Sequence, residues 1–173
     1  MFGGCTAMGI LRAMGIRRRV KEMQEFARIL SFLTGELRYH RDILAQVFTR
    51  VSRKCKAPYA DWLSAVSVSL RNIQDMPPVQ ERAAEADFYQ IWMKNADELY
   101  EKSGLKKEDI EYIYNLGQTI GYLDVQAQEE GLALLQTDLG RHIRELESTS
   151  KEQMKVAFVI GTVVGVLLII ILI

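Results

Sequence analysis

The sequence predicts an all-α fold: a helical bundle of about six helices, followed by a C-terminal transmembrane helix. Apolar residues recur every three or four positions through most of the 173 residues, and strand-like alternation of apolar and polar residues is absent. The last eighteen residues, VAFVIGTVVGVLLIIILI, contain no charged side chain. These observations divide the chain into an N-terminal segment (1–16), a bundle domain (17–153) and a transmembrane helix (154–173).

The C-terminal apolar run is long enough to cross a bilayer, whose hydrocarbon core of about 30 Å needs about 20 apolar residues as a helix. Because lysine and arginine near a span stay on the cytoplasmic side, the bundle is predicted to face the cytoplasm. The cations near the run all precede it: Arg141, Arg144, Lys151 and Lys155. Within the run, Gly161 and Gly165 form a GxxxG spacing that indicates transmembrane helix packing or self-association, although this spacing also arises by chance in spans.

The N-terminal segment mixes apolar residues with glycines and carries Arg12 as its one charge. It is predicted to be either the remnant of an N-terminal membrane segment, since it is too short for a whole span, or an interfacial anchor. The basic cluster that follows would be a solvated helix end in a soluble protein. Beside an apolar segment it is predicted to lie at a membrane surface, with membrane lipid as its partner. It consists of Arg17, Arg18, Arg19 and Lys21.

The first three helices are predicted from apolar spacing and from signals at helix ends. The first spans about 17–38 and has one continuous apolar face. Asp42 is expected to cap the second, which ends near the basic stretch 53–56. Pro58 suits the first turn of a third helix, on which Trp62 belongs to the apolar face.

The last three helices follow a break around residues 72–79 that contains two prolines. The fourth is expected over 83–102, with Trp92 on its buried face, and the fifth over 105–119. Asp124 is expected to cap a sixth helix. No proline follows, so this helix either continues into the span as a rod or bends at a polar hinge.

The turn between the fifth and sixth helices contains a second group of candidate residues: Gly117, Gly121, Asp124 and Gln128. One interpretation is structural, with a helix end, a tight turn, a cap and a solvated amide. The other is a partner-docking corner, in which the glycines let a partner backbone approach and the polar side chains supply hydrogen bonds.

The sequence offers no pattern typical of a catalytic, cofactor or metal site. His40 and His142 are the only histidines, and neither has a cysteine partner at metal-ligand spacing. His142 follows Asp138 by four residues, which predicts a pair on the helix surface. The P-loop and dinucleotide-binding glycine patterns are absent. Twenty-two basic and 22 acidic residues are interspersed, so neither nucleic acid nor an acidic substrate is predicted. With no site for chemistry, no small-molecule substrate is expected.

Several residues together resemble the stage III sporulation protein AB family of endospore-forming bacteria, over nearly the whole chain. The resemblance is carried by Gly4-Cys5-Thr6, Glu36-Leu37-Arg38-Tyr39, Trp92, the run Leu116-Gly117, Ile120-Gly121, Asp124, Gln128, and the C-terminal span. The chain departs from the family at its start, where the family carries a full N-terminal span.

This resemblance implies a non-enzymatic component of the channel-like, secretion-like complex between mother cell and forespore. It also implies a bundle similar to the F-type domains of the type II secretion inner-membrane platform. The expected partners are other stage III sporulation proteins, above all the AA ATPase, and the expected location is the mother-cell membrane around the forespore. The alternative is a tail-anchored regulatory adaptor that recruits a soluble partner.

Overall fold

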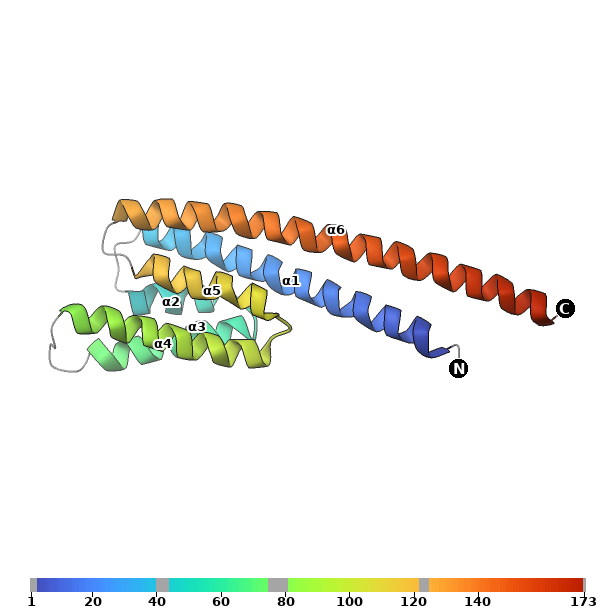
Figure 1. Ribbon diagram of the computed structural model, residues 1–173. Coiled ribbons are helices and arrows are strands. Elements are labelled where there is room, and N and C mark those ends of the chain that lie inside the picture. Colours follow the sequence, from blue (N-terminus) through green and yellow to red (C-terminus); the bar gives the residue numbers. More distant parts are fainter. Residues whose placement is uncertain (1–2, 40–43, 75–80, 122–124, 173) are drawn as a thin grey trace.

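Six α-helices make up the part of the chain that the computed structural model describes, residues 3–39, 44–74, 81–121 and 125–172 (Figure 1). No strand occurs within those ranges, so the prediction of an all-α fold with six helices is confirmed. The helices are α1 (Gly3–Tyr39), α2 (Leu44–Ser52), α3 (Tyr59–Gln74), α4 (Glu81–Lys102), α5 (Lys107–Ile120) and α6 (Val125–Leu172).

The helices form a closed ring of neighbours. Each packs against the next in the chain, and α6 packs along α1 to close the ring. α1 and α6 are the longest helices, run antiparallel and extend together beyond the other four (Figure 1). The start of α1 at Gly3 and the end of α6 at Leu172 therefore lie at the same end of the molecule.

The two long helices differ from the predicted boundaries. α1 begins at Gly3 and not near Arg17, because the intervening Ala, Met, Leu and Ile favour a helix that isolated glycines weaken but do not stop. α6 runs unbroken for 48 residues, about 72 Å at 1.5 Å per residue. The predicted polar hinge at 147–151 is thus absent, and the domain boundaries predicted near residues 17 and 154 fall inside continuous helices.

Four aromatic rings form the centre of the core. Trp92 on α4 is fully buried, and its ring centroid lies 5.6 Å from that of Phe48, 4.9 Å from that of Trp62 and 5.9 Å from that of Phe88. The indole Nε1 of Trp92 donates a hydrogen bond of 2.7 Å to the carbonyl of Ile113 on α5. Both tryptophans are therefore core residues, as predicted, and Trp92 connects α4 to three other helices, α2, α3 and α5.

Two helix starts have a visible cause. The carbonyl of Pro58 accepts the amide of Trp62 at 3.1 Å, so this proline leads directly into α3. At the start of α5 the carboxylate of Asp109 accepts the amide of Lys106 at 2.8 Å, which satisfies one of the free donors of the first turn. The predicted caps Asp42 and Asp124 lie outside the described residues.

Candidate functional site

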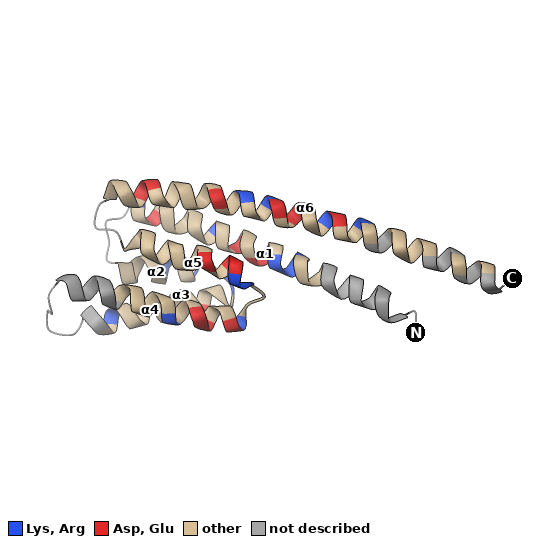
Figure 2. Ribbon diagram, viewed as in Figure 1, with Lys and Arg blue, Asp and Glu red and all other residues tan. Residues whose placement is uncertain are grey.

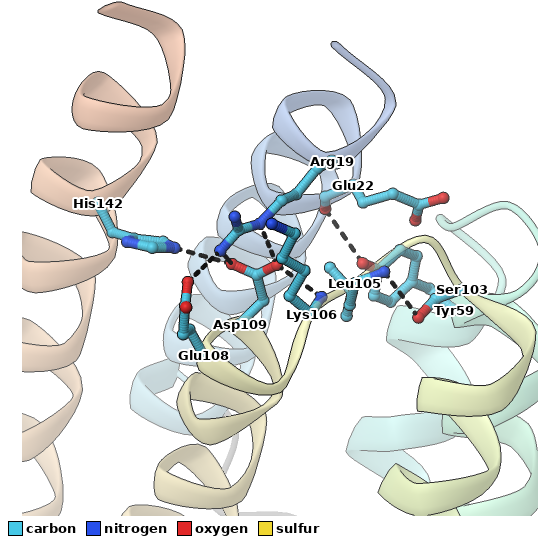
Figure 3. A network of polar contacts seen from close by, with 9 residues as sticks. All are labelled: Arg19, Glu22, Tyr59, Ser103, Leu105, Lys106, Glu108, Asp109 and His142. Atoms are coloured by element: carbon cyan, nitrogen blue, oxygen red, sulfur yellow. Dashed lines mark hydrogen bonds and ion pairs between the residues drawn. The ribbon is translucent and has the colours of Figure 1, made fainter. Parts of the chain in front are cut away.

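A buried ion cluster joins α1, α5 and α6 (Figure 3). Arg19 on α1 donates from Nε to Oδ2 of Asp109 at 2.5 Å and from Nη2 to Oδ1 of Asp109 at 2.8 Å. Its Nη2 also donates to Glu108 at 2.8 Å. Nε2 of His142 on α6 lies 2.8 Å from Oδ1 of Asp109. The Asp109 carboxylate, with an exposure of 0%, thus has a partner on each of the two long helices.

The charges in this cluster stabilise one another. Burial on its own would raise the pKa of Asp109, but hydrogen bonds from Arg19, the Lys106 amide and His142 outweigh it and hold the pKa below its ordinary value. Burial opposes the charge of Arg19 too, and hydrogen bonds to Asp109 and Glu108 raise its pKa above the ordinary value. Asp109 and Arg19 are therefore both charged at neutral pH.

This cluster changes the interpretation of two sequence predictions. Arg19 lies inside the bundle with 8% of its side chain exposed, so its charge serves the α1–α5 contact and not a membrane surface. His142 pairs with Asp109, whereas the predicted partner Asp138 lies 3.5 Å from Arg141. The ring of His142 also stacks on Tyr112, with centroids 5.1 Å apart. Sequence spacing within one helix could not indicate these partners, because they lie on other helices.

Gly117 is explained by the core of the bundle. A Cβ atom at this position would lie 2.2 Å from Cδ1 and 2.5 Å from Nε1 of Trp92, closer than any real contact. The glycine is needed so that the backbone of α5 can approach the indole. The close approach predicted for a partner backbone is thus made by a side chain of the same chain, which supports the structural interpretation.

The neighbouring residues of the predicted corner also have internal roles. Gln128 on α6 donates from Nε2 to the carbonyl of Ile120 at 2.8 Å and so satisfies a free acceptor at the end of α5. Gly121 has helical dihedral angles, and its amide bonds to the carbonyl of Gly117 at 3.1 Å. Asp124 lies outside the described residues, so its predicted docking role stays a prediction.

The other predicted glycine pair lies near the C-terminal end of α6. A Cβ atom at Gly161 would have no neighbour within 4 Å, whereas the surroundings of Gly165 lie outside the described part. Helix packing through this pair stays a prediction. Within the described residues, no helix has the length and hydropathy that a membrane crossing requires.

Three of the four predicted basic residues are exposed on α1, namely Arg17, Arg18 and Lys21. They lie beside α6 and line an open cleft of about 580 Å³ between the two long helices. Figure 2 shows basic residues on both α1 and α6 at the point where these helices extend beyond the other four. The sequence indicated the basic residues of α1 but not that α6 completes a cleft with them.

A second groove, of about 500 Å³, lies between α5 and α6, next to the buried ion cluster. Four carboxylates line it but only one arginine, Arg141. Tyr112 and Asn115 lie among these charged residues. The carboxylates are those of Glu108, Glu111, Asp138 and Glu145. The sequence did not indicate this groove, because its two walls lie on different helices. One wall is formed by residues 108–115 of α5 and the other by residues 135–145 of α6.

The helices and their internal ion cluster define an α-helical bundle protein with open grooves between α1 and α6 and between α5 and α6. Over residues 1–173 the sequence matches the model of the stage III sporulation protein AB family, so the chain belongs to this family of sporulation proteins. A solved structure of a stage III sporulation protein AB has the same fold. Its TM-score is 0.63 at 21% sequence identity, over 78% of this chain and 97% of that one. No curated protein matches the chain.

Proposed function

We propose that the protein is a non-enzymatic, membrane-anchored structural component of a channel complex of stage III sporulation proteins. The complex connects mother cell and forespore, and the helical bundle docks its secretion-type ATPase, stage III sporulation protein AA. Membership of the stage III sporulation protein AB family over the whole chain is the observation that carries this proposal. The bundle belongs on the cytoplasmic side of the mother-cell membrane, with a fold similar to the type II secretion platform domains.

Membrane attachment is supported by the C-terminal part of α6. After Lys155 the helix has no charged residue, and large apolar side chains are more than half exposed in the isolated chain. Water-exposed apolar surface of this extent is normally covered by another protein or by lipid. The exposed side chains are those of Val156, Val159, Ile160, Val163, Leu167 and Ile170.

Removal of residues 156–173 is expected to release the protein from membranes. In density-gradient flotation of a cell lysate, the full chain should rise with the vesicles and stay there after alkaline carbonate washing. The shortened chain should remain at the bottom, because about 0.8 kcal/mol of binding free energy is lost for every buried CH₂ removed. Circular dichroism of the shortened chain is the control for an intact bundle. A full chain that does not float would contradict membrane attachment.

Partner docking is supported by the groove between α5 and α6. Its walls are fixed relative to each other, because the hydrogen bond between Asp109 and His142 bridges them at the groove. Glu111 and Glu145 on opposite walls are exposed, and Tyr112 offers an aromatic ring between them. An acidic rim around an aromatic residue suits a basic surface on a partner, and we propose this groove as the docking surface for the ATPase.

Charge reversal at the groove is expected to weaken recovery of the ATPase. The full chain, tagged and purified from sporulating cells in mild detergent, should bring the AA ATPase with it. Glu111→Lys with Glu145→Lys should lower the recovered ATPase by about tenfold or more, because like charges facing each other across an interface are strongly unfavourable. The matched control is Glu98→Lys with Glu101→Lys on α4, which changes the charge equally and should leave recovery unchanged.

Two results would contradict this docking proposal. Equal loss of ATPase in the groove variant and the α4 control would show an effect of net charge. Recovery of another soluble partner without any stage III sporulation protein would favour the alternative function, a tail-anchored regulatory adaptor.

A further inference from the structure

The cleft between α1 and α6 combines cationic and apolar walls. It lies at the point of α6 where the last charged residues give way to the apolar run. Figure 2 shows basic residues of both long helices where these helices leave the rest of the bundle. A molecule in the cleft would therefore contact both the bundle and the apolar end of α6. Its main lining side chains are Arg17, Lys21 and Lys151, with Met14, Val20 and Met154.

The charge of the cleft is positive on balance. Arg17, Arg18, Lys21 and Lys151 line it, against a single carboxylate, that of Glu147. The Glu147 carboxylate already accepts a hydrogen bond of 2.7 Å from Gln24 across the helix pair. The guanidinium of Arg18 lies 3.8 Å from Glu22 with 66% of its side chain exposed, a contact too loose to neutralise it. The cleft therefore attracts an anion.

The rest of the cleft is apolar, which a site for a small hydrated anion would not need. Met14 is largely exposed, Val20 forms part of the floor, and Met154 lies one residue before the last lysine of α6. Ser150, only 5% exposed, adds a hydroxyl to the same wall. An occupant that matches these walls carries a negative phosphate group joined to a hydrocarbon chain.

We propose that this cleft is a binding site for one anionic phospholipid. Its phosphate lies among Arg17, Lys21 and Lys151, and its acyl chain passes over Met14 and Met154 towards the apolar end of α6. This inference rests on the proposed membrane attachment and deepens it. Cations are attracted to any negatively charged membrane surface, whereas here a single lipid bound between the two longest helices fixes the position of the bundle.

The test is native mass spectrometry of the full chain in non-ionic detergent, titrated with phosphatidylglycerol. The expected result is saturable binding of one lipid molecule per chain. Phosphatidylcholine should bind more weakly because its headgroup carries no net charge. Inorganic phosphate and glycerophosphoglycerol, which lacks acyl chains, should not compete. Because the chain is held in detergent, the measurement does not depend on insertion into a bilayer.

A pair of charge-removing variants separates the cleft from general electrostatics. Lys21→Gln with Lys151→Gln, one on each wall, should weaken phosphatidylglycerol binding by about tenfold or more. Lys56→Gln with Lys155→Gln removes the same charge outside the cleft and should change the affinity by less than about twofold. Lys155 makes this control strict, because it lies only one helical turn beyond Lys151 and yet does not line the cleft.

Three outcomes would overturn the lipid site: equal weakening in both pairs, binding that does not saturate, and competition by inorganic phosphate. Each would leave flotation of the full chain unchanged. Failure of the membrane proposal itself is recognised separately, by loss of flotation of the full chain.

Discussion

Gly117→Ala is expected to lower the free energy of unfolding by about 2 kcal/mol or more, because the new methyl group overpacks the core. Alanine would gain up to about 1 kcal/mol of helix propensity over glycine, but a Cβ 2.2 Å from the Trp92 ring forces the indole or the α5 backbone to move. The indole cannot move freely, because it is enclosed by three other rings and bonded to the Ile113 carbonyl. The measurement is denaturant unfolding of the full chain in detergent, followed by tryptophan fluorescence.

A matched glycine on another helix gives the control for Gly117→Ala. A Cβ atom at Gly35, inside α1, would have no neighbour within 4 Å. Gly35→Ala should therefore stabilise the protein by about 0.5–1 kcal/mol through helix propensity alone. Combining Gly117→Ala with Trp92→Phe, which removes the clashing five-membered ring, should cost less than the sum of the two single changes. Additive effects would show that the contact with Trp92 is not the cause.

Much of the helical architecture could be predicted from the sequence, because apolar spacing reports directly on which face of a helix is buried. The register of Met23, Phe26, Leu30 and Leu33 placed one face of α1 in the core, and all four are buried. Helix ends were less predictable. The start of α1 was misplaced because the apolar residues before Arg17, with Arg12 as their one charge, suggested a separate membrane segment, although nothing in that stretch prevents a helix.

The internal contacts of the site were not predictable, since each joins residues that are distant in sequence. Arg19 did leave one signal: it lies four residues before Met23, so it continues the buried face of α1 backwards. A charge in that register needs a partner, but spacing alone cannot indicate that the partner is Asp109, 90 residues later. For the same reason Gly117 was recognised as special while its cause, Trp92 on another helix, was not.

Arg19→Ala is expected to lower the free energy of unfolding by about 3–5 kcal/mol, because it leaves the buried carboxylate of Asp109 without its main counterion. The Lys106 amide and His142 would remain its partners, at a site with no exposure to water. The control is the adjacent Arg18→Ala, which removes an exposed side chain and should change stability by about 0.5 kcal/mol or less. Equal losses in the two variants would contradict a structural role of the buried cluster.

The pH dependence of this loss tests the mechanism. Asp109 has a lowered pKa in the folded protein, so its contribution to stability is present above the unfolded pKa of about 3.9 and is lost as pH falls through the folded value. Without Arg19, burial dominates and raises the pKa of Asp109, so the carboxyl group takes up a proton at a higher pH. The stability difference between wild type and Arg19→Ala should therefore narrow from neutral pH to about pH 4.

Replacing both members of the buried pair separates the unpaired charge from lost packing. Arg19→Met with Asp109→Leu removes the two charges together and retains apolar volume, and such replacements of buried ion pairs are often neutral or stabilising. The double variant should therefore be more stable than Arg19→Ala at neutral pH. Its free energy of unfolding should no longer change with the titration of residue 109 as the pH is lowered. If the double variant is no more stable than Arg19→Ala, the loss of stability comes from the altered shape of the α1–α5 contact. If its stability is recovered, the loss came from the unpaired charge of Asp109, and the cluster serves to neutralise the carboxylate that caps α5 in the wild type.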